Sequence, residues 1–509
     1  MMTLPEVLID GQNLSIEDLI LIRDGNTNVK LDLSAKSRMQ LSQNAILEIL
    51  NSKDMIYGIN TGFGAMSNVK IDNKDLAKLQ VNLIRSHACG VGDLMEPEHV
   101  LMMMAIRSNS LAVGHSGIRP HIVEVIIEFI NKRICPVIPR IGSLGASGDL
   151  APLSHLALGL IGESDFLIEK NGSWELISPE EAFKEINQIP ISLAAKEGLS
   201  LINGTSQMCA FLSDAIHTLE TLVFTADCSV ACSIEAIKGS HKPFDSRIHA
   251  TRPHHGQSIS AARILSLLSN SEINKSHINC DRVQDAYSLR CAPQVHGPVI
   301  EALTKAREIL MVELNSATDN PLIFLNSKGE IDVISGGNFH GQPLALMADN
   351  LAICSHELGS ISERRTNLMM NPKWTDQKAF LAREEGLESG LMILQYVSAA
   401  CLAEMQVLST PASIANVPVS MGKEDHVSMG ATSSYKLLKN CEYLSYILAN
   451  EMISNNMCLR NIDEKPGDGV MKIRGIVDDF LPEMDTDLSF SEVTENLAYS
   501  IRNGLLHNL

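Results

Sequence analysis

The sequence predicts a mainly α-helical protein, with a bundle of long helices as the core and a mixed N-terminal region before it. Three observations support this fold class. Prolines become sparse after Thr205, apolar residues then recur at steps of three and four, and 45% of the 509 residues are hydrophobic. Such spacing is typical of helices that pack against one another. We therefore expect an N-terminal domain at 1–204 and a long-helix domain at 205–509.

The N-terminal region is expected to be mixed, because short β-like stretches and helical patterns alternate there with glycine-rich loops. The β-like stretch Leu4–Asp10 comes first, and glycine-rich loops follow at 58–64, 114–118 and 142–148. Glycine adopts backbone conformations that other residues avoid, so it punctuates the helical patterns. A further β-like stretch, Asp332–Ile334, lies inside the helical region.

Five long helices are expected in the C-terminal part. The clearest follows Pro343, which suits a helix start, and Pro372 lies just past its end. This helix would have about 27 residues and a length of roughly 40 Å. Helices this long expose more apolar surface than one subunit covers, so we expect oligomerisation. The other four apolar runs lie at about 208–226, 299–310, 387–409 and 433–459.

Composition argues against several classes of function. The net charge is −19 without a basic stripe, which disfavours nucleic acid and anionic membranes as partners. The longest uncharged apolar run, Ser389–Ala403, is too short to span a bilayer. The N-terminal residues lack the basic region of a signal peptide. The 11 cysteines form no Cys-x-x-Cys pair, which favours reduced thiols and a cytoplasmic location.

The most informative segment is 142–155, which reads Gly-Ser-Leu-Gly-Ala-Ser-Gly-Asp-Leu-Ala-Pro-Leu-Ser-His. In its triplet Ala146-Ser147-Gly148, the Gly148 nitrogen can attack the Ala146 carbonyl, because glycine has no side chain to block the approach. Loss of one water closes a five-membered ring. Loss of the Ser147 hydroxyl as a second water leaves an exocyclic methylidene, an electrophile that no ordinary side chain supplies well. The bare triplet by itself is more often a flexible turn.

The flanks of the triplet favour the ring. The whole string, with Gly145 before the triplet and Asp149-Leu-Ala-Pro after it, resembles the prosthetic-group segment of the aromatic amino acid ammonia-lyases. That family forms 4-methylidene-imidazole-5-one (MIO) from its own backbone. The resemblance extends from Tyr57 to about residue 435. It implies an N-terminal domain that carries MIO, a helical bundle of the ammonia-lyase and fumarase–aspartase type, and no metal. It also implies a homotetramer whose active sites combine loops from several subunits.

Two further motifs match the family. The segment from Tyr57 to Gly64 is rich in glycine but lacks the Gly-Lys-Ser/Thr of a phosphate loop. A plain loop is one interpretation, and the resemblance places Tyr57 at the substrate, where it would act as a base. Asn203, at the end of Glu197–Thr205, either caps the next helix or lies beside the prosthetic group, and both roles are compatible.

The segment Arg282–Gln294 carries a polar row. Gln284, Tyr287 and Arg290 are spaced by three, which predicts one helical face, and the helix should break at the following Cys-Ala-Pro. A guanidinium there can bind an α-carboxylate through two hydrogen bonds. The resemblance gives Arg290 this role and places Gln284 and Tyr287 near the amine and MIO. A solvated polar face is the alternative.

Substrate choice is indicated by two distant positions. Histidine-specific members of the family carry Ser-His where this chain has Ser86-His87, and Glu where it has Glu424. A carboxylate is a good acceptor for an imidazole N–H. Together with Phe339 as a pocket wall, these residues imply elimination of ammonia from L-histidine to trans-urocanate, the first step of histidine degradation. The chain departs from the family locally: Met421-Gly422-Lys423 replaces a usual Ala-Asn-Gln before Glu424, and His255 replaces a common proline.

A histidine-rich stretch, His241–Gln257, does not fit a common zinc spacing, and its Lys and Arg would oppose a cation, so no metal is expected. Two alternative functions remain at the level of sequence. One is an aminomutase or a lyase for another aromatic amino acid in the same family. The other is a non-catalytic helical scaffold whose triplet never cyclises. A fumarase-type lyase is set aside, because no Gly-Ser-Ser-x-Met-Pro loop is found.

Overall fold

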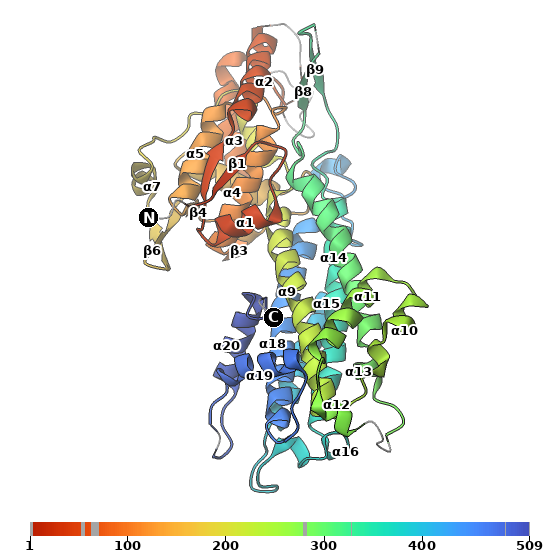
Figure 1. Cartoon of the computed structure of the whole chain (residues 1–509). Helices are drawn as coiled ribbons and strands as arrows, with labels where there is room; N and C mark the ends of the chain where they lie inside the picture. The colour runs from red at the N-terminus through yellow and green to blue at the C-terminus, as the bar shows by residue number, and fades with distance from the viewer. Residues whose placement is uncertain are drawn as a thin grey trace. The chain divides into compact units, whose positions relative to one another are not determined.

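The computed structural model describes residues 4–51, 56, 58–62, 71–277, 282–326, 328–483, 485–507 and 509. The chain divides into two compact units, each made of three segments (Figure 1). Unit 1 comprises Met1–Asp214, Glu308–Ala348 and Pro411–Tyr435. Unit 2 comprises Ala215–Arg307, Asp349–Thr410 and Lys436–Leu509. The domain boundary expected at 204/205 remains a prediction.

The fold is mainly helical, so the predicted fold class is confirmed. The helices are α1 Ile16–Arg23, α2 Leu33–Asn51, α3 Leu76–His87, α4 Pro97–Ala112, α5 Pro120–Asn131, α6 Leu150–Leu160, α7 Pro179–Glu185, α8 Glu197–Ile202, α9 Ser206–Ala236, α10 Ser246–Ala250, α11 His255–Leu267, α12 Glu272–Ser276, α13 Tyr287–Arg290, α14 Ala292–Leu314, α15 Gln342–Met369, α16 Pro372–Thr375, α17 Met392–Leu408, α18 Gly430–Leu459, α19 Asp468–Asp478 and α20 Ser491–Arg502.

The described strands are short, and all of them lie in unit 1. They form a parallel pair β1–β2, antiparallel pairs β3–β5 and β8–β9, and a three-stranded antiparallel sheet in the order β4-β6-β7. Their bounds are β1 Glu6–Ile9, β2 Asn28–Leu31, β3 Val91–Leu94, β4 Ile134–Pro136, β5 Pro139–Ile141, β6 Phe166–Lys170, β7 Ser173–Ile177, β8 Leu322–Leu325 and β9 Ile331–Ile334.

Unit 1 is built around α4, in which every residue from His99 to Ala112 is buried. Helices α1, α2 and α5 pack against it. An aromatic cluster of Phe129, Phe166 and Phe183 joins α5 to β6 and α7, with ring centroids 5.0–6.1 Å apart. This packing fixes the small sheets, and β5 leads from them into the 142–148 loop that carries the triplet.

Unit 2 is a bundle of long helices, as the apolar spacing predicted. The helix expected after Pro343 is α15, which has 28 residues and ends three residues before Pro372. Inside the bundle, the buried carboxylate of Glu451 on α18 accepts hydrogen bonds from Ser233 on α9 and from Ser362 and Arg365 on α15. Three helices therefore meet at one carboxylate whose charge is paired and whose oxygens are satisfied.

Helix α17 leaves much of its apolar surface exposed. Among its 17 residues, only Leu394, Ser398 and Met405 are buried. Val407 and Tyr396 are 71% and 60% exposed, respectively. A face of this kind is costly in water and typical of a surface that another chain covers.

No helix in the described ranges combines the length and the apolar character needed to cross a bilayer. The described cysteines are all free thiols. His255, which replaces a proline common in the family, is the first residue of α11. The first position of a helix readily accepts proline, so proline and histidine both fit this helix start.

Candidate functional site

The triplet lies in the loop between β5 and α6. Ala146 and Gly148 are buried, whereas Ser147 is partly exposed. Gly145 and Gly148 have φ values of +65° and +72°, in the left-handed region that glycine adopts without strain. The backbone on each side of Ser147 is therefore enclosed, while its hydroxyl-bearing side chain retains access to the surface of the unit.

The backbone of the triplet touches the turn after α8. Gly148 pairs with Gly204, and the Asp149 N–H donates to the Gly204 carbonyl at 2.6 Å. A Cβ on Gly148 would overlap with the Gly204 carbonyl oxygen. This approach requires glycine at 148, because any side chain would force the two backbone segments apart.

Asp149 ties the loop to α9. Its carboxylate is fully buried and accepts hydrogen bonds from the backbone N–H of Gln207 at 2.8 Å and of Met208 at 3.1 Å, and from the Ser143 hydroxyl at 2.7 Å. Burial raises the pKa of Asp149 to about 6, although these three hydrogen bonds oppose the shift. Because Asp149 also directly precedes α6, the N-terminal ends of two helices, α6 and α9, meet at the triplet.

Two other loops support the triplet. The Ser428 hydroxyl donates to the Gly145 carbonyl at 3.0 Å, and the Met429 N–H donates to the Leu144 carbonyl at 2.8 Å. Gly341 packs so closely on Met208 and Ser428 that a Cβ there would overlap with the Met208 sulfur. Segments far apart in the sequence, near residues 341 and 428, are thus fixed against the same loop.

Asn203 is buried and ends α8. Its Nδ2 donates to the Asn320 carbonyl at 3.2 Å and to Asp319 Oδ1 at 3.4 Å. Its Oδ1 has no partner among the described residues. The cap of α9 comes from Asp149, so the capping role predicted for Asn203 is wrong. Its unpaired amide oxygen is an acceptor next to Gly204.

His87 is the last residue of α3 and is partly buried. Its Nδ1 lies 2.9 Å from the Leu83 carbonyl and 3.0 Å from Ser86 Oγ, and the Ser86 hydroxyl itself donates to the Leu83 carbonyl at 3.0 Å. A carbonyl oxygen only accepts, so the proton belongs on Nδ1, and Nε2 is then an acceptor. The Leu83 carbonyl therefore fixes the tautomer that His87 presents.

Glu424 and Phe339 are both partly exposed. Glu424 forms a backbone bridge with Val419 across a turn in which Ser420 and Met421 both have positive φ, 54° and 57°. Non-glycine residues in this region carry backbone strain. The departure from the family at Met421-Gly422-Lys423 thus occupies a strained turn that sets the position of Glu424.

Phe339 directly precedes a stacked pair of imidazoles. The rings of His340 and His426 have centroids 5.7 Å apart and are nearly parallel. His340 Nε2 lies 3.2 Å from the His426 carbonyl. These contacts join the Phe339 loop to the segment that leads from Glu424 to Ser428, so two of the predicted site residues belong to one pair of linked loops. Tyr57, by contrast, lies outside the described residues.

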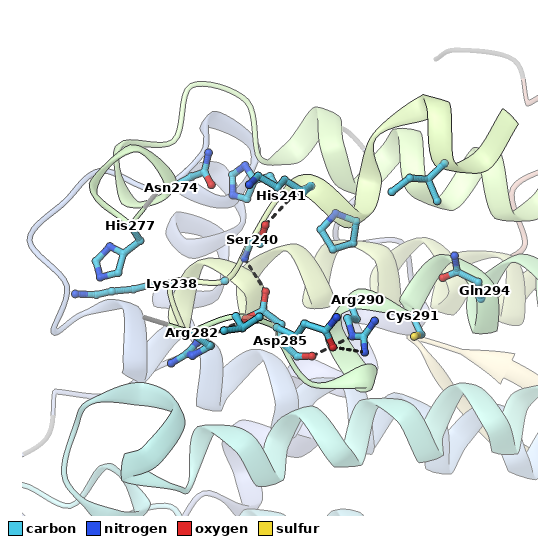
Figure 2. Close-up of a pocket in the computed structure, with 16 residues that line it drawn as sticks. Lys238, Ser240, His241, Asn274, His277, Arg282, Asp285, Arg290, Cys291 and Gln294 are labelled. Carbon is cyan, nitrogen blue, oxygen red and sulfur yellow. Dashed lines mark hydrogen bonds and ion pairs between the residues drawn. The ribbon is translucent and has the colours of Figure 1, made fainter. Parts of the chain in front are cut away.

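Gln284, Tyr287 and Arg290 lie in unit 2, and Gln284 and Arg290 line a cavity of about 690 Å³ (Figure 2). Arg290 donates to the Gln284 side chain at 3.0 Å and to the Asp285 carbonyl at 3.2 Å, and its guanidinium lies 4.4 Å from the Tyr287 ring centroid. The helix breaks after Arg290 as predicted. The shared helical face is wrong for Gln284, because α13 begins only at Tyr287 and Gln284 precedes it.

The cavity in unit 2 is rich in basic groups. Lys238, Arg282 and Arg290 line it together with a single carboxylate, Asp285, which accepts from the Ser240 N–H at 2.7 Å (Figure 2). Arg282 is held by the carbonyls of Ile237 and Trp374. Cationic walls of this kind favour an anionic group such as a carboxylate.

Three buried charged residues near the triplet were missed at the level of sequence. Arg107, Lys196 and Asp319 are at most 1% exposed and lie around Asn203 and Gly204. Arg107 is the only charged residue between Val100 and Val113, and a lone charge in an apolar run is the one signal that the sequence offered. No group of potential metal ligands occurs within the described ranges.

Known proteins resemble this chain over its whole length. The family model described as aromatic amino acid lyase matches residues 14–477. A histidine ammonia-lyase from Myxococcus xanthus is 42% identical over 506 residues, which cover 99% of this chain and 98% of that protein. Both matches include the triplet and every other predicted site residue.

Solved structures share the fold. The crystal structure of histidine ammonia-lyase from Trypanosoma cruzi matches with a TM-score of 0.90 and 37% identity, and the match covers 98% of this chain and 94% of that one. A tyrosine aminomutase from Streptomyces globisporus matches with a TM-score of 0.90 and 33% identity, covering 99% and 98%.

The steric enclosure of the triplet predicts the outcome of a glycine substitution. Gly145→Ala should lower the melting temperature, because a Cβ would overlap with Ser428 Oγ, and overpacking of this kind costs about 1–3 kcal/mol. Gly172→Ala is the matched control, since Gly172 has a similar φ of +77° but no atom within 4 Å of the added Cβ. Thermal unfolding of both variants measures the difference, and equal shifts would contradict the enclosure.

Proposed function

The chain belongs to the aromatic amino acid lyase family and is a carbon–nitrogen lyase, and we propose that it eliminates ammonia from L-histidine to give trans-urocanate. The observation that carries this proposal is the Ala146-Ser147-Gly148 triplet, held where two helix N-termini meet. The histidine ammonia-lyase from Myxococcus xanthus, 42% identical over nearly the full length, supports the choice of substrate.

We propose that MIO forms from the triplet, and the residues present fit this group. Gly148 lacks the Cβ that Gly204 would exclude, and Ser147 keeps its hydroxyl-bearing side chain partly exposed. When formed, MIO would supply an electrophilic carbon that helps the amino group to leave. The N-terminal ends of α6 and α9 would favour negative charge that develops beside Gly148.

The other residues of the site would bind the substrate and move its protons. Tyr57 would remove the β-proton, which requires that its pKa fall from about 10, and a cation or a helix N-terminus beside a tyrosine has this effect. Asn203 would accept from the amine through its unpaired Oδ1. Arg290 would bind the α-carboxylate, and Gln284 and Tyr287, which already contact its guanidinium, would orient it.

His87 and Glu424 would recognise the imidazole of the substrate. With its proton on Nδ1, His87 presents Nε2 as an acceptor, and the Glu424 carboxylate is another, so either group can accept the single N–H of a neutral imidazole. A phenyl ring has no polar hydrogen for either group, so binding it would leave Glu424 desolvated and unpaired. Phe339 would form an apolar wall beside the ring.

We further propose a homotetramer whose active sites combine loops from several subunits. The exposed apolar face of α17 supports this assembly, because Tyr396, Val397 and Val407 lie on a helix with a single charged residue, Glu404. The cytoplasmic location stays a prediction.

Ser147→Ala should abolish turnover and leave the fold intact, because Ser147 supplies the methylidene carbon. Turnover of L-histidine and the melting temperature should be measured together. Ser173→Ala, a surface substitution in β7, is the control and should keep full activity. Wild-type turnover by Ser147→Ala would exclude MIO from the reaction.

Arg290→Lys should lower kcat/KM by roughly ten- to a hundredfold, since lysine cannot make the two-pronged contact and one charge-assisted hydrogen bond is worth about 1.5–3 kcal/mol. Arg282→Lys is the matched control: it lines the same cavity but is held by backbone carbonyls. Equal losses in the two variants would remove Arg290 from the substrate site.

The double variant His87→Phe/Glu424→Gln should narrow the preference for L-histidine over L-phenylalanine. It removes the two acceptors proposed for the substrate imidazole, so the use of histidine weakens most. Leaving such an acceptor buried without a partner, as a phenyl ring does, costs a few kcal/mol. The measurement is kcat/KM for both amino acids in wild type and double variant. An unchanged ratio, or a wild-type preference for phenylalanine or tyrosine, would defeat the assignment of substrate while leaving the family assignment in place.

Val407→Lys should weaken assembly, because it places a charge on the exposed apolar face of α17. Glu180→Lys, at an exposed position of α7, adds positive charge elsewhere and serves as the control. Light scattering after size exclusion gives the mass of each variant. A wild-type monomer, or a tetramer of undiminished stability in Val407→Lys, would count against the proposed interface.

A further inference from the structure

Three charged side chains lie buried directly behind the turn that touches the triplet. Lys196 Nζ donates to Asp319 Oδ2 at 2.7 Å and to Ser200 Oγ at 3.0 Å. The same carboxylate accepts from Asn203 Nδ2 through Oδ1 at 3.4 Å. One carboxylate therefore connects a buried ammonium to the amide group that borders Gly204.

Arg107 approaches the same turn from α4. Its Nη2 donates to the Ser200 carbonyl, and its Nε and Nη1 have no hydrogen-bond partner among the described residues. The guanidinium lies so close to Gly204 that a Cβ there would overlap with Nη1. Burial lowers the pKa of Arg107 to about 10, and Asp319 opposes the shift, so the group is a cation at neutral pH.

Stability alone does not account for this cluster. Burial lowers the pKa of Lys196, and the neighbouring charge of Arg107 lowers it further, while Asp319 raises it. Two buried cations thus share one carboxylate, an arrangement that is costly relative to apolar residues of the same size. These destabilising buried charges are all gathered around one feature, the Asn203–Gly204 turn.

The contacts at this turn lead to the triplet. The Gly204 carbonyl accepts from the Asp149 N–H and lies against Gly148. The Asn203 amide is oriented by its two Nδ2 bonds, which leave Oδ1 unpaired. A shift of Lys196 or Asp319 would rotate this amide, and a shift of Arg107 would release Gly204.

We propose that Arg107, Lys196 and Asp319 are positioning residues that hold Asn203 and Gly204 against Gly148 and thereby control ring closure in the triplet. The proposal rests on the proposed function. In ring closure, the Gly148 nitrogen bonds to the Ala146 carbonyl carbon, and the carbonyl oxygen leaves as water with the amide protons of Gly148 and Ser147. The Ser147 hydroxyl then leaves as a second water with the Ser147 α-proton. Neither step needs an oxidant or a reductant.

The experiment is the intact mass of the purified full-length chain. Wild type should be two waters lighter than its sequence. Lys196→Met and Arg107→Lys should leave a large fraction at the uncyclised mass. The matched control is Arg365→Lys, an equally buried arginine in unit 2 whose partner is Glu451, and it should cyclise completely even if its melting temperature falls.

A second readout separates positioning from stability. In Lys196→Met/Asp319→Asn, both charges of the pair are removed, so the melting temperature should recover relative to Lys196→Met. The uncyclised mass should persist, because Asn203 has lost its carboxylate partner. A purely structural role predicts that cyclisation recovers together with the melting temperature, and that result would overturn the proposal.

Kinetics give a third readout. The cyclised molecules of Arg107→Lys should show a kcat lowered on the order of a hundredfold, as a misplacement of about 1 Å can cause, with KM nearly unchanged, since the cluster does not touch substrate. If Lys196→Met and Arg107→Lys both cyclised completely and kept the wild-type kcat, the positioning role would be overturned, but the proposed function would not. A wild-type chain at its full sequence mass would overturn the proposed function as well.

Discussion

The close approach of Gly148 to Gly204 is the constraint on which the site depends. It requires a residue without a side chain at 148, and it brings the loop after β5 against the turn between α8 and α9. Asp149 then serves both helices that start there, since it precedes α6 and caps α9. The loop near 428 is hydrogen-bonded to Gly145, just before the triplet, and Gly341 packs in turn against Ser428 and Met208.

Buried charge is unevenly distributed around this point. Asp149 and Glu313 lie near the first residues of α9, and burial raises the pKa of both carboxyl groups. Arg107 and Lys196 lie behind Gly204, with Asp319 as their shared counter-charge. A protein that served only as a scaffold would gain stability from apolar residues at these positions. The retention of buried charges on both sides of the triplet supports a chemical role for the loop between them.

The sequence predicted the long helices well, because apolar spacing and the prolines at 343 and 372 are local signals. It failed at Gln284, where spacing by three indicated a helix, although the helix that follows has only four residues. It also offered Asn203 as a cap of the next helix, whereas the carboxylate that caps α9 belongs to Asp149, which only a tertiary contact brings there. Arg107 and Asp319 were missed because their pairing joins residues more than 200 positions apart.

The most direct test of the central claim is the product that the wild-type chain forms from L-histidine. We predict trans-urocanate, seen as a rising absorbance in the near ultraviolet, together with one free ammonia for each urocanate. An aminomutase, the activity named for the Streptomyces globisporus relative, would instead return the amine to the substrate and form a β-amino acid without this absorbance. A β-amino acid as the main product, or no product from L-histidine, would contradict the account.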